Sequence, residues 1–159
     1  MKKYLLIALT VCSLYACTKN TENTESHDHH TTGSPLNDKT QEVLAIHDSI
    51  MPNMDKLMEL KKQLKTEVKI TDSLLALKPV NTFKTYKNEA LKITAELDSA
   101  DHAMMGWMHG FKMDSLKKLD KSQAEAYVAD QKKKIEEVRE LMNKSITNAS
   151  EFIEKNKNK

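Results

Sequence analysis

The amino-acid sequence predicts an all-α protein: an antiparallel three-helix bundle with long helices, which follows a signal peptide and a tether. Three observations predict this fold. Apolar residues recur about every 3.5 positions in three segments, as in packed helices. Three glycines and three prolines in 159 residues are too few for a β-rich chain with many turns. With 30% charged and 39% hydrophobic residues, the composition favours one soluble domain over a polytopic membrane protein.

The N-terminal residues, 1–16, have the pattern of a signal peptide. Lys2 and Lys3 precede an apolar run, residues 4–11, which is too short to remain as a membrane span. The following sequence, Leu14-Tyr15-Ala16-Cys17, resembles the lipobox of bacterial lipoproteins. The resemblance implies cleavage after Ala16 and acylation of Cys17, whose lipid chains would hold the protein on a membrane. An ordinary signal peptide with a chance cysteine is the alternative.

Removal of residues 1–16 would leave a mature chain without a free thiol and without net formal charge. Cys12 would be lost and Cys17 acylated, which excludes a cysteine nucleophile, CxxC redox chemistry and c-type haem attachment. Lys2 and Lys3 account for the net charge of +2, so basic and acidic residues balance in the remainder. A chain without net charge has no overall electrostatic attraction to nucleic acid. We therefore do not expect nucleic acid as a partner.

Residues 17–38 predict a lipid-anchored flexible tether, because they are rich in Thr, Asn and Ser and almost lack apolar residues. His27, His29 and His30 flank Asp28 within this tether. Such a cluster can bind a divalent transition metal weakly, although incidental histidines in a polar linker are the simpler interpretation. The helical domain is expected to span residues 39–159.

The first helical segment is expected to run from Lys39 to about Leu77, ahead of Pro79. Pro52 lacks an amide N–H and predicts a kink near residues 48–51. The apolar stripe of this segment consists of Val43, Ile46, Ile50, Leu57 and Leu64.

The second and third segments have more regular stripes. The second segment, with Asn81 or Thr82 as its N-cap, has the stripe Tyr86, Ala90, Ile93, Leu97, Ala100, Met104, Trp107 and Phe111. Gly106 and Gly110 fall away from that stripe and weaken the last turns. The third segment begins near Lys121 and has the stripe Ala124, Val128, Gln131, Ile135, Val138, Met142, Ser145, Ala149 and Phe152.

Methionine and histidine gather in two windows of the first two segments. One window holds His47, Met51, Met54 and Met58, and the other holds His102, Met105, Met108, His109 and Met113. Both helices rise about 1.5 Å per residue. If the chain turns back at Val80, two residues that are equally far from Val80 in the sequence therefore lie at the same height in the bundle. Met58 would then meet His102, Met54 would meet Met105, Met51 would meet His109, and His47 would meet Met113.

These side chains permit two functional hypotheses and one structural one. Thioether sulfur together with imidazole suits Cu(I), so the nine residues are a candidate copper site that Trp107 could cover with its ring. Methionine also forms adaptable surfaces, which favours an adaptor that receives an apolar helix of another envelope protein. Simple packing of a helical core is the third reading. Haem held by a His/Met pair fits poorly with so few aromatic residues.

The chain resembles small helical lipoproteins of Bacteroidota, which often carry the label "viral A-type inclusion protein". The resemblance rests on residues 47–54 (HDSIMPNM), residues 100–108 (ADHAMMGWM) and the charged third segment. It implies an exported helical domain that is lipid-anchored in the cell envelope. We expect the outer membrane as its location, on either the periplasmic side or the cell surface. It implies no activity. No HExxH, phosphate loop or GxSxG occurs, so we expect a non-catalytic protein.

Overall fold

The computed structural model describes residues 35–157, and this part of the chain is helical with short turns and without strands. The predicted signal peptide, acylated Cys17 and tether histidines His27, His29 and His30 lie outside the described residues. The helices are α1 (Pro35–Ile50), α2 (Asn53–Leu77), α3 (Asn81–Gly110), α4 (Met113–Leu116) and α5 (Lys121–Asn156). None of them is long and apolar enough to cross a membrane.

The predicted kink in the first segment is present as a break between α1 and α2. α1 ends at Ile50, and α2 begins at Asn53 after a turn at Met51 and Pro52. The amide of Met54 donates to the carbonyl of Met51 at 3.0 Å, which is a tighter turn than that of an α-helix. Pro52 has no N–H to donate to the preceding turn, so the helix is interrupted at this position.

The ends of the helices agree with the sequence pattern in some places and differ in others. α1 begins at Pro35, earlier than the expected start at Lys39, while α2 ends at Leu77 as predicted. The predicted cap at Asn81 or Thr82 is wrong. The N-cap of α3 is Val80 in an extended conformation, because the helix starts one residue sooner after Pro79. α4 was not predicted.

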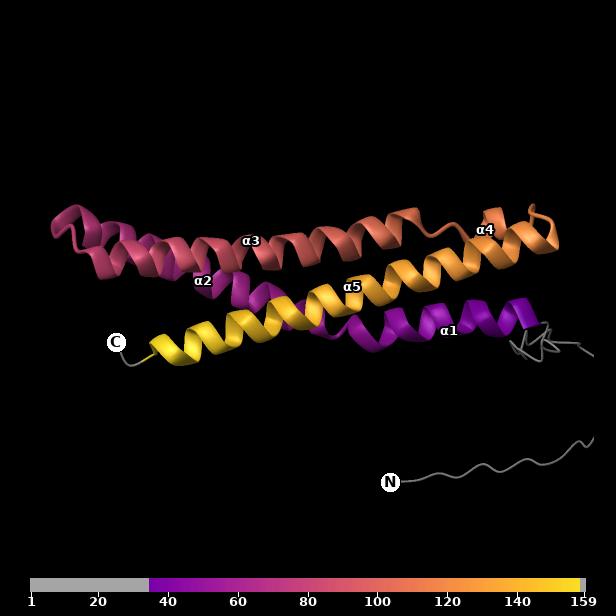
Figure 1. Cartoon of the computed structure of the whole chain (residues 1–159), viewed down its shortest axis with the longest axis horizontal. Coiled ribbons are helices and arrows are strands. Elements are labelled where there is room, and N and C mark those ends of the chain that lie inside the picture. Colours follow the sequence, from indigo (N-terminus) through magenta and orange to yellow (C-terminus); the bar gives the residue numbers. More distant parts are fainter. Residues whose placement is uncertain (1–34, 158–159) are drawn as a thin grey trace, which may run out of the picture. The chain divides into compact units, whose positions relative to one another are not determined.

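The long helices pack side by side into a helical bundle. Figure 1 shows α1 and α2 running in one direction, α3 returning, and α5 running back again. α5 packs against α1, α2 and α3, and α2 packs against α3. One apolar core joins these helices and takes in most residues of the predicted stripes, while Ile46, Tyr86 and Phe111 are partly buried against it. All nine stripe residues of α5 are buried, as are Ala90, Ile93, Leu97, Ala100, Met104 and Trp107 of α3 and Val43, Ile50, Leu57 and Leu64 of α1 and α2.

Buried hydroxyl groups in the core are satisfied within their own helices. Thr40 donates to the carbonyl of Leu36 at 2.9 Å, and Thr94 donates to that of Ala90 at 2.8 Å. Thr71 does the same with the carbonyl of Glu67 at 2.8 Å. A buried hydroxyl without a partner would be costly, so these bonds let polar residues occupy the seams between helices.

Candidate functional site

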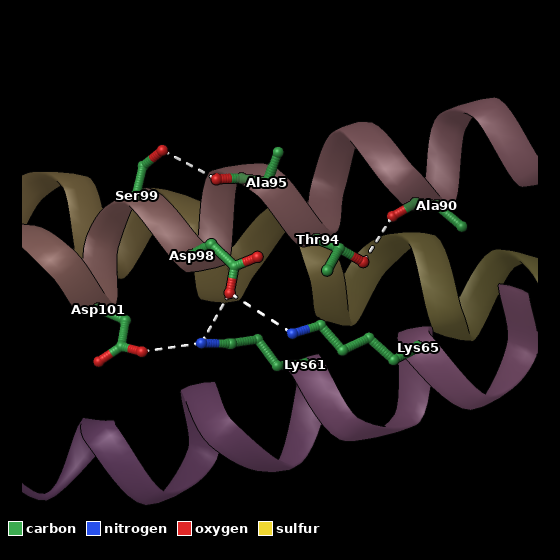
Figure 2. Close-up of polar contacts among 8 residues, drawn as sticks. All are labelled: Lys61, Lys65, Ala90, Thr94, Ala95, Asp98, Ser99 and Asp101. Carbon is green, nitrogen blue, oxygen red and sulfur yellow. Dashed lines mark hydrogen bonds and ion pairs between the residues drawn. The ribbon is translucent and has the colours of Figure 1, made fainter.

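An ion cluster centred on the buried Lys61 connects α2 with α3. The Lys61 ammonium lies 2.7 Å from Asp98 Oδ1 and 2.8 Å from Asp101 Oδ2, and only 10% of its side chain is exposed. Lys65 approaches the same Asp98 oxygen at 3.7 Å. Figure 2 shows the Lys61 nitrogen between the two carboxylates and Asp98 facing both lysines. The cluster holds two cations and two anions, so its formal charge is balanced.

The pKa shifts in this cluster indicate a structural clamp. Burial lowers the pKa of Lys61, but hydrogen bonds with Asp101 and Asp98 outweigh it and raise that pKa above 10.5. The hydrogen bond from Lys61 lowers the pKa of Asp98 below 3.8. The shifts favour the charged forms of Lys61 and Asp98, whereas a general acid or base needs a pKa near the working pH. The cluster therefore acts as a clamp that fixes the register of α2 on α3.

The clamp also confirms the predicted fold of the chain at Val80. Lys61 precedes Val80 by about as many residues as Asp98 follows it, which is the level pairing expected for two helices of equal rise. His47 departs from that pairing. Its ring lies against Trp107, with 5.2 Å between ring centroids, and not beside Met113 as predicted. The break at Met51 and Pro52 explains the difference, because α1 does not continue the axis and rise of α2.

An aromatic stack joins α1, α3 and α5 at this end of the bundle. Trp107 stacks between His47 and Phe111, and its centroid lies 5.0 Å from that of Phe111. Phe111 stacks in turn on Tyr127 at 6.3 Å. The indole N–H of Trp107 donates to the Gln131 carbonyl of α5 at 3.4 Å. Trp107 thus contacts an imidazole from α1 and the ring of Phe111, while its predicted role of covering a cation stays a prediction.

His47, one of the predicted metal ligands, is partly buried. Its Nδ1 lies 2.9 Å from Asp48 Oδ1, and its side chain is 18% exposed. Nε2 is buried without a hydrogen-bond partner among the described residues. Because the ring face packs on Trp107, the imidazole is held in place by stacking and by one carboxylate.

The other predicted ligands lie in two different environments. Met51, Met54 and Met108 are half-buried and pack against the core. His102 and His109 are exposed, as are Met58, Met105 and Met113 with exposed fractions of 49%, 39% and 45%. His102, Met105 and His109 share one face of α3, since they are spaced by three and four residues, and that face points outward. The structure brings His47 to α3, and the other predicted ligands divide between half-buried and exposed positions.

Other metal ligands do not cluster in the described part of the chain. Among residues 35–157, no group of three or more His, Cys, Asp or Glu side chains is arranged to hold a metal ion. A site built from thioethers is a different arrangement, so the copper site stays a prediction. Half-burial against the core supports the packing role for Met51, Met54 and Met108.

A groove between α3 and α5 lies beside Trp107, near the methionines of the second half of α3. Its volume is about 470 Å³. The α3 side consists of Ala103, Gly106, Trp107 and Gly110, and the α5 side of Gln131, Lys134, Glu137, Val138 and Leu141. Lys134 and Glu137 pair with Asp130 and Lys133 on α5 itself, at 2.6 and 3.9 Å. Three small residues and Trp107 therefore line the α3 side. The α5 side combines Gln131, Val138 and Leu141 with the paired charges Lys134 and Glu137, here called the rim charges.

The two glycines of this groove have no role in packing within the chain. A Cβ built at Gly106 or Gly110 meets no other atom within 4 Å, and neither residue adopts the left-handed backbone conformation that favours glycine. The sequence pattern had placed both glycines away from the core stripe, but it did not indicate a groove. The signal that could have found it is the spacing of Ala103, Gly106 and Gly110 by three and four residues, which puts three small residues in one row.

No protein-family model, curated protein or solved structure matches the chain.

Proposed function

We propose that this protein is a non-catalytic binding module of the bacterial cell envelope, which receives an apolar helix of another protein in the α3–α5 groove. In this proposal the acylated Cys17 anchors the chain to a membrane. α1 and α2 together form one kinked helix of an antiparallel three-helix bundle. The lipobox pattern supports the anchor, and the helical bundle supplies the rigid surface.

Gly106 and Gly110 are the main support for this proposal. Glycine in a helix costs about 1 kcal/mol relative to alanine. This chain accepts that cost at Gly106 and Gly110, although its own packing leaves room for a side chain at both. A role outside the folded chain accounts for both residues: without side chains, α3 leaves space for the backbone of a second helix to approach closely.

The shape of the groove suits a short stretch of helix. Ala103 and Gly110 are separated by about 10 Å along α3, which corresponds to two turns of a bound helix. Such a helix would place apolar residues at positions i, i+3 or i+4, and i+7 against Trp107, Val138 and Leu141. The rim charges Lys134 and Glu137 already have partners on α5, so no cation or anion of the ligand is required.

Photo-crosslinking in the producing cell tests the groove. A benzophenone amino acid at Leu141 lies on the groove wall, and one at Leu91 lies on an exposed part of α3 outside it. We expect one protein adduct from position 141 and none from position 91. Gly106→Phe fills the groove and should remove the adduct, whereas Gly106→Ala should keep it. An adduct that persists with Gly106→Phe, or equal adducts from both positions, would refute the groove as a binding site.

The anchor has a separate test. Cys17→Ser removes the acylated side chain, so we expect the protein to move from the membrane fraction to the soluble fraction. A protein that stays in the membrane fraction after this change would overturn the lipobox interpretation, while leaving the groove proposal untouched.

A further inference from the structure

The hairpin tip, defined as residues 69–84 around the turn between α2 and α3, lacks the cover that the rest of the bundle has. Within the described residues, no apolar side chain between Leu64 and Ala90 is fully buried. Phe152, near the end of α5, lies against Tyr86 with ring centroids 5.0 Å apart, and α5 ends at Asn156. Figure 1 shows α5 ending before the turn that joins α2 and α3. The tip is therefore a two-helix structure.

One face of this tip is apolar and open to solvent. Ile70, Leu74 and Leu77 follow one another by four and three residues, so they share a face of α2. Their exposed fractions are 55%, 40% and 85%. Single exposed leucines are common, but three on one face at the end of a hairpin form a continuous apolar surface.

The charge around this face is positive. Lys69, Lys78 and Lys84 are all exposed. Asp72 is the sole acidic residue between Lys69 and Asn88, and its Oδ1 lies 2.5 Å from the Lys87 ammonium. Asp72 of the tip is thus paired within the hairpin, and Glu67, one turn before Ile70 on the same face, accepts a hydrogen bond from the Tyr86 hydroxyl. Lys69, Lys78 and Lys84 are exposed on the tip.

We propose that the hairpin tip binds an anionic lipid bilayer surface. Apolar side chains that flank lysines are the arrangement by which a helix enters the interface between headgroups and acyl chains. The lysine ammoniums would lie near headgroup phosphates while their alkyl stems extend along the apolar region. Leu74 and Leu77 are already exposed, so they can enter the interface without unfolding either helix. This contact involves neither the α3–α5 groove nor acylated Cys17.

Environment-sensitive fluorescence on the full chain tests this contact. Cys12→Ser and Cys17→Ser remove both native cysteines, after which Ser73→Cys places an NBD label between Ile70, Leu74 and Leu77. Ser115→Cys places the same label on α4, outside the tip. The probe membranes are vesicles of phosphatidylcholine with or without phosphatidylglycerol.

We expect a blue shift of the label at position 73 with phosphatidylglycerol vesicles and none with phosphatidylcholine alone. The label at position 115 should not shift with either. Lys78→Glu combined with Lys84→Glu should weaken binding about thirtyfold or more, because each lysine near an anionic surface contributes about fivefold. The matched control, Lys117→Glu with Lys118→Glu, should leave binding unchanged. Leu74→Asn with Leu77→Asn should abolish the blue shift while the circular dichroism spectrum stays helical.

Three results would overturn the proposal. Equal shifts at positions 73 and 115 would mean that the whole chain adsorbs without orientation. Equal shifts with neutral and anionic vesicles would remove the role of the lysines. A shift at position 73 that grows with protein concentration in the absence of vesicles would show that a second copy of the chain covers the apolar face.

Discussion

Lys61 shows how one buried charge can fix the contact between two helices. Its ammonium contacts both Asp98 and Asp101, and its removal would leave two carboxylates close together without their shared cation. Asp98 and Asp101 keep some exposure, so water would compensate part of the loss. The contribution of Lys61 is therefore expected to be moderate and dependent on pH.

We predict that Lys61→Met lowers the free energy of unfolding by about 1–2 kcal/mol near neutral pH, measured by urea denaturation. The lowered pKa of Asp98 gives stabilisation that is present above pH 3.8 and is lost as the pH falls through the lowered value. The raised pKa of Lys61 gives stabilisation that is present below pH 10.5 and is lost as the pH rises through the raised value. The difference between wild type and variant should shrink outside that window. Lys133→Met, in an exposed pair, should show no such dependence.

The copper hypothesis can also be tested at the scale of single residues. Met54 packs against the core and Met105 is exposed, so we expect Ag(I), a stand-in for Cu(I), to give no stabilisation that depends on these sulfurs. Melting temperatures with Ag(I) should shift equally in wild type and in Met54→Leu with Met105→Leu, because leucine keeps the volume and removes the thioether. Stabilisation that occurs in wild type alone would establish the metal site.

The contacts of individual side chains were harder to predict than the helix face on which each residue lies. Periodicity assigns residues to one face of a helix but does not set how far each helix rotates against its neighbour. Lys61 sits among lysines in the sequence and looks solvated, yet the rotation of α2 turns it onto Asp98 and Asp101. The contact of His47 with Trp107 depends on the angle of α1 after Pro52, which no local pattern gives.

At the scale of elements, the stripes of α3 and α5 were the most predictable feature. Each stripe alternates steps of four and three residues, so one face stays apolar over many turns and has to be buried. The helix starts were less predictable. The capping box of α5, in which Asp120 Oδ1 accepts from the Gln123 amide at 2.9 Å, is readable in the sequence but was missed.

We predict that Asp120→Ala lowers the free energy of unfolding by about 1 kcal/mol, because the first turn of α5 loses its side-chain cap. Thermal unfolding followed by circular dichroism measures the loss. Asp114→Ala on α4 is the matched control, since this aspartate is 97% exposed. A variant at position 120 that unfolds like the control would show that water replaces the cap.

A second element-scale prediction concerns α3. Gly106→Ala should raise the free energy of unfolding by about 0.5–1 kcal/mol, because alanine has the higher helix propensity and its Cβ meets no atom. Chemical denaturation measures the gain. A loss of stability would mean that the groove closes on itself in solution, and the reason given for the glycines would no longer hold.

At the scale of the whole molecule, one core connects α1, α2, α3 and α5. Leu97 is fully buried in it, so Leu97→Asp should unfold the bundle, with the loss of its far-ultraviolet helical signal at room temperature. Leu91→Asp, on the same helix with a 45% exposed side chain, should remain folded. If Leu97→Asp unfolds no more readily than Leu91→Asp, the core does not act as one cooperative unit.

The break between α1 and α2 has a mechanical consequence. α1 packs chiefly on α5 and is joined to α2 by the turn at Met51 and Pro52, without a continuous helix across it. A pull on the N-terminal side of the bundle therefore reaches α1 first and can peel it from α5 while α2, α3 and α5 stay packed. Sixteen residues lengthen by about 30 Å when a helix becomes extended chain. α1 would thus extend and release the His47–Trp107 stack before the packing of α3 on α5 is lost.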